Sequence, residues 1–393
     1  MDHSAASASA RPPPSTHSGA QSGADTSTGI RVVVVDDSAV IRGLVKRWID
    51  ETPGLEVAGY GTDGTQAIAA AGAVKPHVMI LDIEMPLMDG LEALPAILKA
   101  SPETKVIMAS TLTLRNADIS LKALTLGAAD YVPKPDSARG IAGSESFRRE
   151  LLDKVRALGD AARKVRGHGA PAAKVSGGGS GAAAVPPAGA IALRAASTVR
   201  PRVLAIGAST GGPQALFDVF KKIGPSLKTV PVLVTQHMPP SFTKILADKL
   251  AALSGLNAHE GVDGERLLAG HIYVAPGDYH MRVRKDGPSV AIALDQGPPV
   301  HFCRPAVDPM FDSVATVFGA ATLGVVLTGM GYDGRDGGRI IADGGGTIFA
   351  QDEETSVVWG MPGACAQAGI CAGVYPLDKI STAIIDTFAG RAT

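Results

Sequence analysis

The stretch Arg-Val-Val-Val-Val-Asp-Asp-Ser-Ala-Val-Ile-Arg-Gly-Leu-Val-Lys-Arg-Trp, residues 31–48, passes from a run of valines to a helical pattern. The valine run is typical of a buried β-strand. After Asp36 and Asp37, apolar side chains recur at steps of one, three and four, which places them on one face of a helix. These side chains are Val40, Ile41, Leu44, Val45 and Trp48. Residues 31–48 therefore predict a strand followed by a helix.

The same alternation continues along the first part of the chain. Further strands are predicted at 55–60, 77–81, 105–109 and 129–132, with helical patterns between them. Five strand and helix alternations indicate an α/β fold with a doubly wound parallel sheet.

The second half of the chain begins in the same way. Strands are predicted at 203–208, 232–235, 323–327 and 347–350, and amphipathic helices at 214–223 and 241–253. Residues 257–295 instead carry repeated turn signals between short alternating runs, which we interpret as a β-hairpin insertion. A second doubly wound α/β domain with this insertion is expected.

Composition marks the predicted boundaries. Residues 1–29 are mostly small and polar and are expected to form a disordered tail. The first domain is placed at 30–145, a helix followed by an Ala/Gly/Pro-rich linker at 146–200, and the second domain at 201–393.

Charge and apolar content narrow the classes of function. Lys plus Arg (37) and Asp plus Glu (38) nearly cancel, so the basic excess of a nucleic-acid-binding protein is missing. No stretch approaches the roughly 18–20 apolar residues of a membrane span, and no signal peptide is evident. Three cysteines without metal-ligand spacing are read as ordinary thiols. We expect a cytoplasmic protein that neither binds nucleic acid nor inserts in a membrane.

Polar residues follow the strands of the first domain. Asp36 and Asp37 end the first strand, Asp82 ends the third, Ser110 ends the fourth and Lys134 follows the fifth. Because carboxyl ends of parallel strands share one edge, three carboxylates would converge there and would need a cation such as Mg²⁺. Such a set suits phosphoryl transfer to a carboxylate, with Asp82 as the nucleophile. Ordinary acidic loop residues are the alternative for any one of them.

The first domain resembles the receiver domains of two-component response regulators. The resemblance rests on Val-Val-Asp-Asp-Ser, on Leu-Asp-Ile-Glu-Met-Pro-Leu-Met-Asp-Gly (81–90) and on Val-Pro-Lys-Pro. It implies that Asp82 is the phosphoacceptor and that a histidine kinase is the phosphodonor. It also implies a metal site at Asp36, Asp37 and Asp82, a switch hydroxyl at Ser110 and a phosphate-sensing Lys134.

In the second domain, Gly207-Ala-Ser209-Thr-Gly211 lies between a strand and a helix. This is the context of a G-x-S-x-G nucleophile elbow, although a glycine-rich turn there could equally hold a dinucleotide phosphate. The next strand end separates the two readings. A dinucleotide site would have an acidic residue there, whereas this chain has Gln236-His237.

Asp333 follows a later strand and completes a Ser, His and Asp set at one edge. Ser209 would be the nucleophile, His237 the general base, and Asp333 the group that orients the imidazole. Asp336 and Asp343 are weaker rivals for the acid. Backbone N–H groups near Thr210 and at Met330 are candidates for an oxyanion hole, and the Thr210 hydroxyl is expected to support the site.

Several other polar residues can be explained by structural roles alone. A lone histidine at a strand end is more often structural than catalytic, and none of the additional histidines is predicted to follow a parallel strand. These are His259, His271, His280 and His301. The pair Arg304-Pro305 could contact substrate or could simply cover the surface.

The second domain resembles the catalytic domain of chemotaxis protein-glutamate methylesterases. The resemblance rests on Gly-Ala-Ser-Thr-Gly-Gly (207–212), Gln-His-Met-Pro-Pro (236–240), Cys-Arg-Pro-Ala-Val-Asp (303–308) and Leu-Thr-Gly-Met-Gly-Tyr-Asp-Gly (327–334). Cys303 and Tyr332 occupy positions that vary within this family. The resemblance implies hydrolysis of glutamyl methyl esters on methyl-accepting chemotaxis receptors, deamidation of receptor glutamines, and no cofactor for the hydrolysis.

The two resemblances together imply regulation. Phosphate on Asp82 would shift the first domain between two packings and uncover Ser209. A receiver-controlled transcription factor would need a recognition helix and a basic face, which residues 201–393 lack. A purely binding output would tolerate loss of Ser209.

Overall fold

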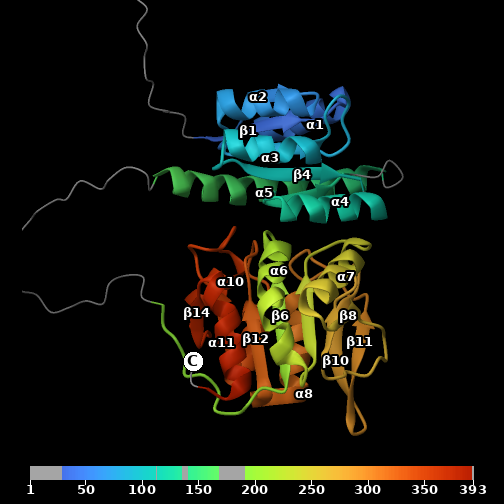
Figure 1. Cartoon of the computed structure of the whole chain (residues 1–393), viewed down its shortest axis with the longest axis vertical. Helices are drawn as coiled ribbons and strands as arrows, with labels where there is room; N and C mark the ends of the chain where they lie inside the picture. Colours follow the sequence, from blue (N-terminus) through green and yellow to red (C-terminus); the bar gives the residue numbers. More distant parts are fainter. Residues whose placement is uncertain (1–28, 112, 135–139, 168–190, 392–393) are drawn as a thin grey trace, which may run out of the picture.

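The computed structural model describes residues 29–111, 113–134, 140–167 and 191–391, arranged as two α/β domains one above the other (Figure 1). The predicted tail, except its last residue, and much of the predicted linker lie outside these ranges. In the part of the chain that is described, no helix is long and apolar enough to cross a membrane.

The N-terminal domain is a five-stranded parallel sheet in the order β2-β1-β3-β4-β5. Its elements are β1 (Ile30–Val35), α1 (Ala39–Asp50), β2 (Leu55–Gly61), α2 (Gly64–Val74), β3 (Val78–Asp82), α3 (Gly90–Ala100), β4 (Lys105–Ser110), α4 (Leu114–Thr125), β5 (Asp130–Pro133) and α5 (Gly140–Gly167). Helices α1 to α4 each begin at a Ser, Asp or Thr whose side chain accepts a backbone N–H, which fixes where the helix starts. The predicted parallel α/β fold is confirmed.

Helix α5 belongs to this domain rather than to the linker. Its apolar stripe, Phe147, Leu151, Val155 and Leu158, is buried in one cluster with Val32 and its neighbours on the sheet. The expected domain end at residue 145 therefore falls inside α5. Composition could not show this, because the helix runs directly into the Ala/Gly/Pro-rich sequence that suggested the boundary.

The C-terminal domain is a seven-stranded parallel sheet in the order β14-β13-β12-β6-β7-β9-β8. Its elements are β6 (Val203–Ala208), α6 (Gly212–Ile223), β7 (Val232–Gln236), α7 (Phe242–Ser254), β8 (Asn257–Glu260), β9 (His271–Val274), β10 (His280–Asp286), β11 (Ser289–Asp295), α8 (Val307–Phe318), β12 (Thr322–Val326), α9 (Arg335–Asp343), β13 (Thr347–Gln351), α10 (Met361–Gln367), β14 (Gly373–Tyr375) and α11 (Leu377–Ala389), with short 3₁₀ turns at Gly224–Leu227 and Gly319–Ala321.

The hairpin insertion is shorter than expected. Only β10 and β11 form an antiparallel pair, whereas β8 and β9 join the main parallel sheet. His259 and His271 thus lie in strands of the parallel sheet rather than in the expected insertion, although neither follows a parallel strand. A short alternating run has the same sequence pattern whether it pairs with the next run or with a distant strand. The turn signals therefore led to the wrong pairing for β8 and β9.

The strand order defines a crevice in the C-terminal sheet. β6 lies between β7 and β12, so the chain leaves β6 toward one side and later returns on the other. In open α/β sheets, ligands bind at the carboxyl ends of strands where the order reverses in this way. Ser209, His237 and Asp333 all follow strands that meet at this crevice.

The N-terminal domain packs on the carboxyl edge of the C-terminal sheet. In Figure 1 helix α4 lies on the side of the N-terminal domain that faces α6 and α7. Helix α4 contacts both helices, and the rings of Tyr131 and Phe242 are stacked with centroids 4.5 Å apart. Buried apolar side chains of α4 and β5 belong to the same cluster as those of α6 and α7. The apolar core is therefore continuous across the domain interface.

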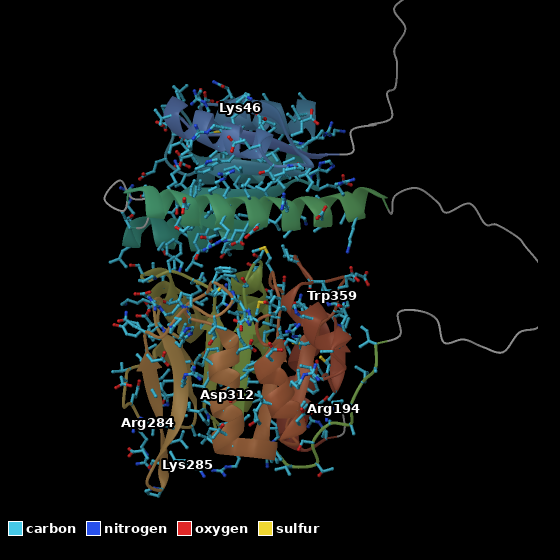
Figure 2. The ribbon with its side chains drawn as sticks, turned by 180° about the vertical axis from the view of Figure 1, so that it is seen from behind. Lys46, Arg194, Arg284, Lys285, Asp312 and Trp359 are labelled. Carbon is cyan, nitrogen blue, oxygen red and sulfur yellow. The ribbon has the colours of Figure 1, made fainter. Side chains whose placement is uncertain are left out.

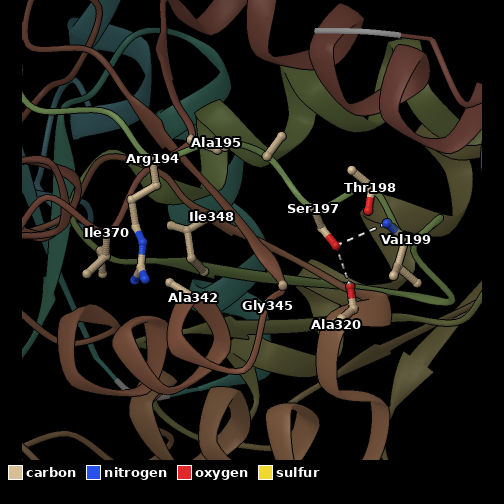
Figure 3. A pocket seen from close by; sticks show the side chains of 13 residues that line it. Arg194, Ala195, Ser197, Thr198, Val199, Ala320, Ala342, Gly345, Ile348 and Ile370 are labelled. Carbon is tan, nitrogen blue, oxygen red and sulfur yellow. Dashed lines mark hydrogen bonds between the residues drawn. The ribbon is translucent and has the colours of Figure 1, made fainter.

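The chain that leads into the C-terminal domain lies at the opposite edge. Arg194, Ser197 and Val199 line a pocket of about 520 Å³ beside the start of β13, where the Ser197 hydroxyl donates to the Ala320 carbonyl at 3.1 Å (Figure 3). This pocket is at the amino ends of the strands. It is therefore separate from the crevice.

Candidate functional site

The acidic residues of the N-terminal domain converge as expected. Carboxylate oxygens of Asp36, Asp37 and Asp82 lie within 4.8 Å of one another. The Lys134 ammonium group lies 2.7 Å from an oxygen of Asp36 and 2.7 Å from one of Asp82. Three clustered oxygen donors suit a hard cation, so the residues present fit a Mg²⁺ ion.

Burial controls the charge of Asp82. It raises the pKa of this carboxyl to about 6, although the Lys134 ammonium opposes the rise. Burial also tends to lower the pKa of Lys134, but the neighbouring Asp82 and Asp36 carboxylates raise it overall. Ser110 is buried nearby, where its hydroxyl pairs with Ser120 of α4 at 3.0 Å rather than with a carboxylate.

The structure brings Ser209, His237 and Asp333 to one edge. Ala208 pairs with Gln236 in the register of β6 and β7, so Ser209 and His237 are the next residues on adjacent strands. His237 Nε2 lies 2.7 Å from Asp333 Oδ2. Among the described residues, no hydrogen bond joins the Ser209 hydroxyl to His237.

Asp333 is held as a buried anion. Its oxygens accept the backbone N–H groups of Val307 at 2.6 Å, Asp308 at 2.9 Å and Gly334 at 3.0 Å. Burial tends to raise the pKa of Asp333, but the bond from His237 and the N–H groups of Val307 and Asp308 lower it overall. The rival acids lie elsewhere, since Asp336 pairs with Arg335 and Asp343 pairs with Arg194.

Cys303 is the unexpected neighbour of His237. Its sulfur lies 3.4 Å from His237 Nδ1, the ring nitrogen opposite to the one that binds Asp333. Burial tends to lower the pKa of His237, but Cys303 and Asp333 raise it to about 10. All three cysteines are free thiols, as expected. The place of Cys303 beside the imidazole was not predicted, because the loop that carries it is distant in sequence from His237.

Close packing fixes the Ser209 backbone. Gln236 donates to the Ser209 carbonyl at 2.9 Å, and the Gly212 N–H donates to the same oxygen at 2.7 Å. A Cβ at Gly212 would lie 2.1 Å from the Gln236 side-chain oxygen, and one at Gly329 would lie 2.9 Å from the Ser209 Cβ. This role of Gln236 in holding the Ser209 carbonyl was not predicted from the sequence.

The two candidate oxyanion donors flank Ser209. In the described part of the chain, the backbone N–H groups of Thr210 and Met330 donate to no other protein atom. The loop that carries Met330 is tied down by Thr328, whose hydroxyl donates to the Thr210 carbonyl at 2.9 Å and accepts the Val358 N–H at 3.0 Å. Thr328 was not predicted, since a buried threonine after a strand has no distinctive sequence signal.

The Thr210 hydroxyl does not support the triad as expected. It is buried and bonds neither Ser209 nor His237. Burial raises the pKa of Asp130 in the N-terminal domain, and Lys154 and the Thr210 hydroxyl oppose that rise. In the described structure the Thr210 hydroxyl has no hydrogen-bond partner.

The remaining candidates have structural roles. Arg304 binds Asp278 and the carbonyls of Gln296 and Gly297, so it anchors its own loop. His301 pairs with Asp308 at 3.0 Å, and His259 pairs with Glu265 at 2.7 Å. Neither histidine contacts Ser209.

The N-terminal domain borders this site directly. The Arg149 guanidinium of α5 lies 4.4 Å from the ring centre of Phe302, the residue before Cys303. Trp359, whose backbone bridges to Gly329 in the Met330 loop, lies at the end of the C-terminal domain that faces the N-terminal one (Figure 2).

A receiver sheet joined to an α/β domain with a serine, a histidine and an aspartate at its crevice defines a response regulator with a hydrolase output domain. Family models agree. The response regulator receiver domain matches residues 32–142, and CheB methylesterase matches residues 204–384. The chain belongs to the protein-glutamate methylesterase/protein-glutamine glutaminase family.

Relatives of that name match most of the chain. The protein from Rhodopseudomonas palustris (strain HaA2) is 52% identical over 92% of this chain and 95% of its own length. The protein from Azospirillum brasilense is 48% identical over 97% of this chain and 98% of its own length.

Solved structures match each domain separately. The catalytic domain of the Thermotoga maritima CheB methylesterase is 39% identical, with a TM-score of 0.46, and covers 48% of this chain and 99% of its own. The response regulator domain of Thermotoga maritima CheB is 42% identical, with a TM-score of 0.31, and covers 34% of this chain and 97% of its own.

Proposed function

We propose that the chain hydrolyses methyl esters of glutamate side chains on methyl-accepting chemotaxis receptors. The observation that carries this proposal is the convergence of Ser209, His237 and Asp333 after three adjacent parallel strands, with the His237–Asp333 bond at 2.7 Å. The shared name of the full-length relatives supplies the substrate class.

Each residue has a role in the proposed acyl transfer. Ser209 attacks the ester carbonyl, and His237 takes the serine proton and returns it to the departing methanol. Asp333 fixes the imidazole and stabilises its charged form. The Thr210 and Met330 N–H groups bind the oxyanion, and water then releases the free glutamate.

The same steps would deamidate a receptor glutamine. The carbonyl carbon is again attacked by Ser209, and His237 protonates ammonia rather than methanol as the leaving group. Relatives that carry both activities in their name support this second reaction.

We further propose that the receiver domain holds the site in a resting state. His237 Nδ1 faces the Cys303 sulfur at 3.4 Å rather than the Ser209 hydroxyl, so the imidazole is not placed to accept the Ser209 proton. The α4 contacts with α6 and α7 cover the crevice on the same side. Activation must therefore loosen the interface and redirect His237 from Cys303 to Ser209.

Phosphorylation of Asp82 by a histidine kinase is the proposed trigger. Asp36, Asp37 and Asp82 would hold the Mg²⁺ ion that neutralises the phosphate oxygens. Lys134, now paired with Asp36 and Asp82, would turn to the phosphoryl group. The Ser110 hydroxyl would break its bond with Ser120 of α4 and donate to the phosphoryl group instead. Loss of that bond would allow α4 to move and would change its contacts at the domain interface. The proposed setting is the cytoplasm.

Methanol release from methyl-esterified receptor tests the proposal. We expect release from wild type, an increase on Asp82 phosphorylation, and a loss of at least about 10³-fold in Ser209→Ala. Equal release by Ser209→Ala would overturn the triad and favour a binding output. Release that does not respond to phosphorylation would overturn the regulation only.

A further inference from the structure

Cys303 is presented to His237 by a tight turn. The backbones of Val300 and Cys303 exchange hydrogen bonds of 3.0 and 2.9 Å, and the two residues between them, His301 and Phe302, have φ values of 51° and 63°. Non-glycine residues rarely adopt this left-handed conformation. The conformation of the turn therefore sets where the thiol points.

The thiol, the imidazole and the carboxylate form a chain. Cys303 Sγ is 3.4 Å from His237 Nδ1, and His237 Nε2 is 2.7 Å from the buried Asp333. An adjacent imidazole held by a third group is the arrangement that activates a cysteine nucleophile. Ser209, by contrast, has no hydrogen bond to His237 in the described structure.

The other thiols of the chain lack such a partner. Cys365 and Cys371 are buried, and burial raises the pKa of Cys365 well above its ordinary value and that of Cys371 to about 12. Cys303 is only half-buried. The same molecule thus carries one accessible thiol beside an imidazole and two that are protected.

We propose that Cys303 is a second nucleophile of this site and a modification site for small electrophiles, hydrogen peroxide among them. The Cys303 thiol passes its proton to His237 Nδ1, the sulfur attacks one peroxide oxygen, the O–O bond breaks, and the sulfur is oxidised to a sulfenic acid. The departing hydroxide takes a proton from the His237 imidazolium and leaves as water. With iodoacetamide, an S–C bond forms and iodide leaves.

Modification of Cys303 would also inhibit ester hydrolysis. A group attached to the Cys303 sulfur, 3.4 Å from His237 Nδ1, would crowd the ring nitrogen that must serve Ser209. This consequence rests on the proposed function, whereas the reactivity of the thiol does not.

Iodoacetamide labelling of the full chain at pH 7, followed by peptide mass spectrometry, tests the reactivity. We expect Cys303 to be alkylated at least about tenfold faster than Cys365 and Cys371, and about tenfold faster than Cys303 of His237→Gln. Cys365 and Cys371 report on folding, since a misfolded variant would expose them. Asp333→Asn serves as the second variant if they do become labelled. Equal Cys303 rates in wild type and in the folded variant would overturn the proposal.

Peroxide treatment tests the consequence. We expect wild-type methanol release to fall in step with Cys303 oxidation and to return with dithiothreitol, while the release that Cys303→Ala retains is insensitive. Equal inactivation of Cys303→Ala would overturn this inhibition. A chain that releases no methanol before treatment refutes the proposed function, and the labelling result still decides the reactivity.

Discussion

Asp82 and His237 lie in the two domains, and in each case burial competes with a nearby charge. At Asp82 burial prevails, and its pKa rises to about 6. At His237 the interactions with Cys303 and Asp333 outweigh burial, and its pKa rises to about 10. These balances could not be read from the sequence, because the partners Lys134 and Cys303 come from strand ends and loops far along the chain.

The raised pKa of Asp82 predicts a pH-dependent metal affinity. Because Mg²⁺ binds the ionised carboxylate, protons compete with it as the pH falls through about 6. We expect the Mg²⁺ affinity of the whole chain to fall by up to about tenfold per pH unit below this value, measured by isothermal titration calorimetry.

Asp82→Asn is the matched control for that titration. Its Mg²⁺ affinity should be weaker and much less dependent on pH near 6. If the variant keeps the wild-type slope, the titrating group is not Asp82.

Helices and strands were predicted better than the contacts between them. The strands of the first domain lie within two residues of their predicted bounds, because β-branched runs bounded by polar residues signal a buried parallel strand. The predictions that β8 and β9 belong to a hairpin insertion and that α5 lies outside the first domain were wrong. Both depended on which element each one packs against, and local sequence patterns do not show this. The domain interface follows no period and could not be predicted either.

Helix α5 offers a direct test of the interface. Arg149 contacts Phe302 of the other domain, so Arg149→Ala should weaken the resting state by about 0.5–1 kcal/mol. We expect methanol release by the unphosphorylated chain to rise about two- to fivefold, with little change after phosphorylation.

The adjacent Arg148 provides the control, because it pairs with Glu51 inside the receiver domain. Arg148→Ala should leave unphosphorylated release at the wild-type level. A similar rise in both variants would point to general loosening of α5 and contradict the role of the Arg149–Phe302 contact.

The whole molecule couples two sheets through one continuous apolar core. Since α4 and β5 share that core with α6 and α7, movement of α4 must expose apolar surface on both sides. Hydrogen exchange of the full chain should therefore accelerate in α4 and α7 on phosphorylation, while the β10–β11 hairpin, whose buried side chains belong to a separate cluster, stays unchanged. Uniform acceleration throughout the C-terminal domain would instead indicate unfolding.

The placement of the receiver over the carboxyl edge of the C-terminal sheet implies reciprocity. A receptor segment that enters the crevice must displace the same α4 contacts that phosphate on Asp82 is proposed to loosen. By thermodynamic linkage, whatever factor phosphate adds to receptor affinity, bound receptor adds to the stability of the phosphorylated state. The substrate would then act as an effector of its own enzyme, and a cell rich in methylated receptor would retain more of the active form.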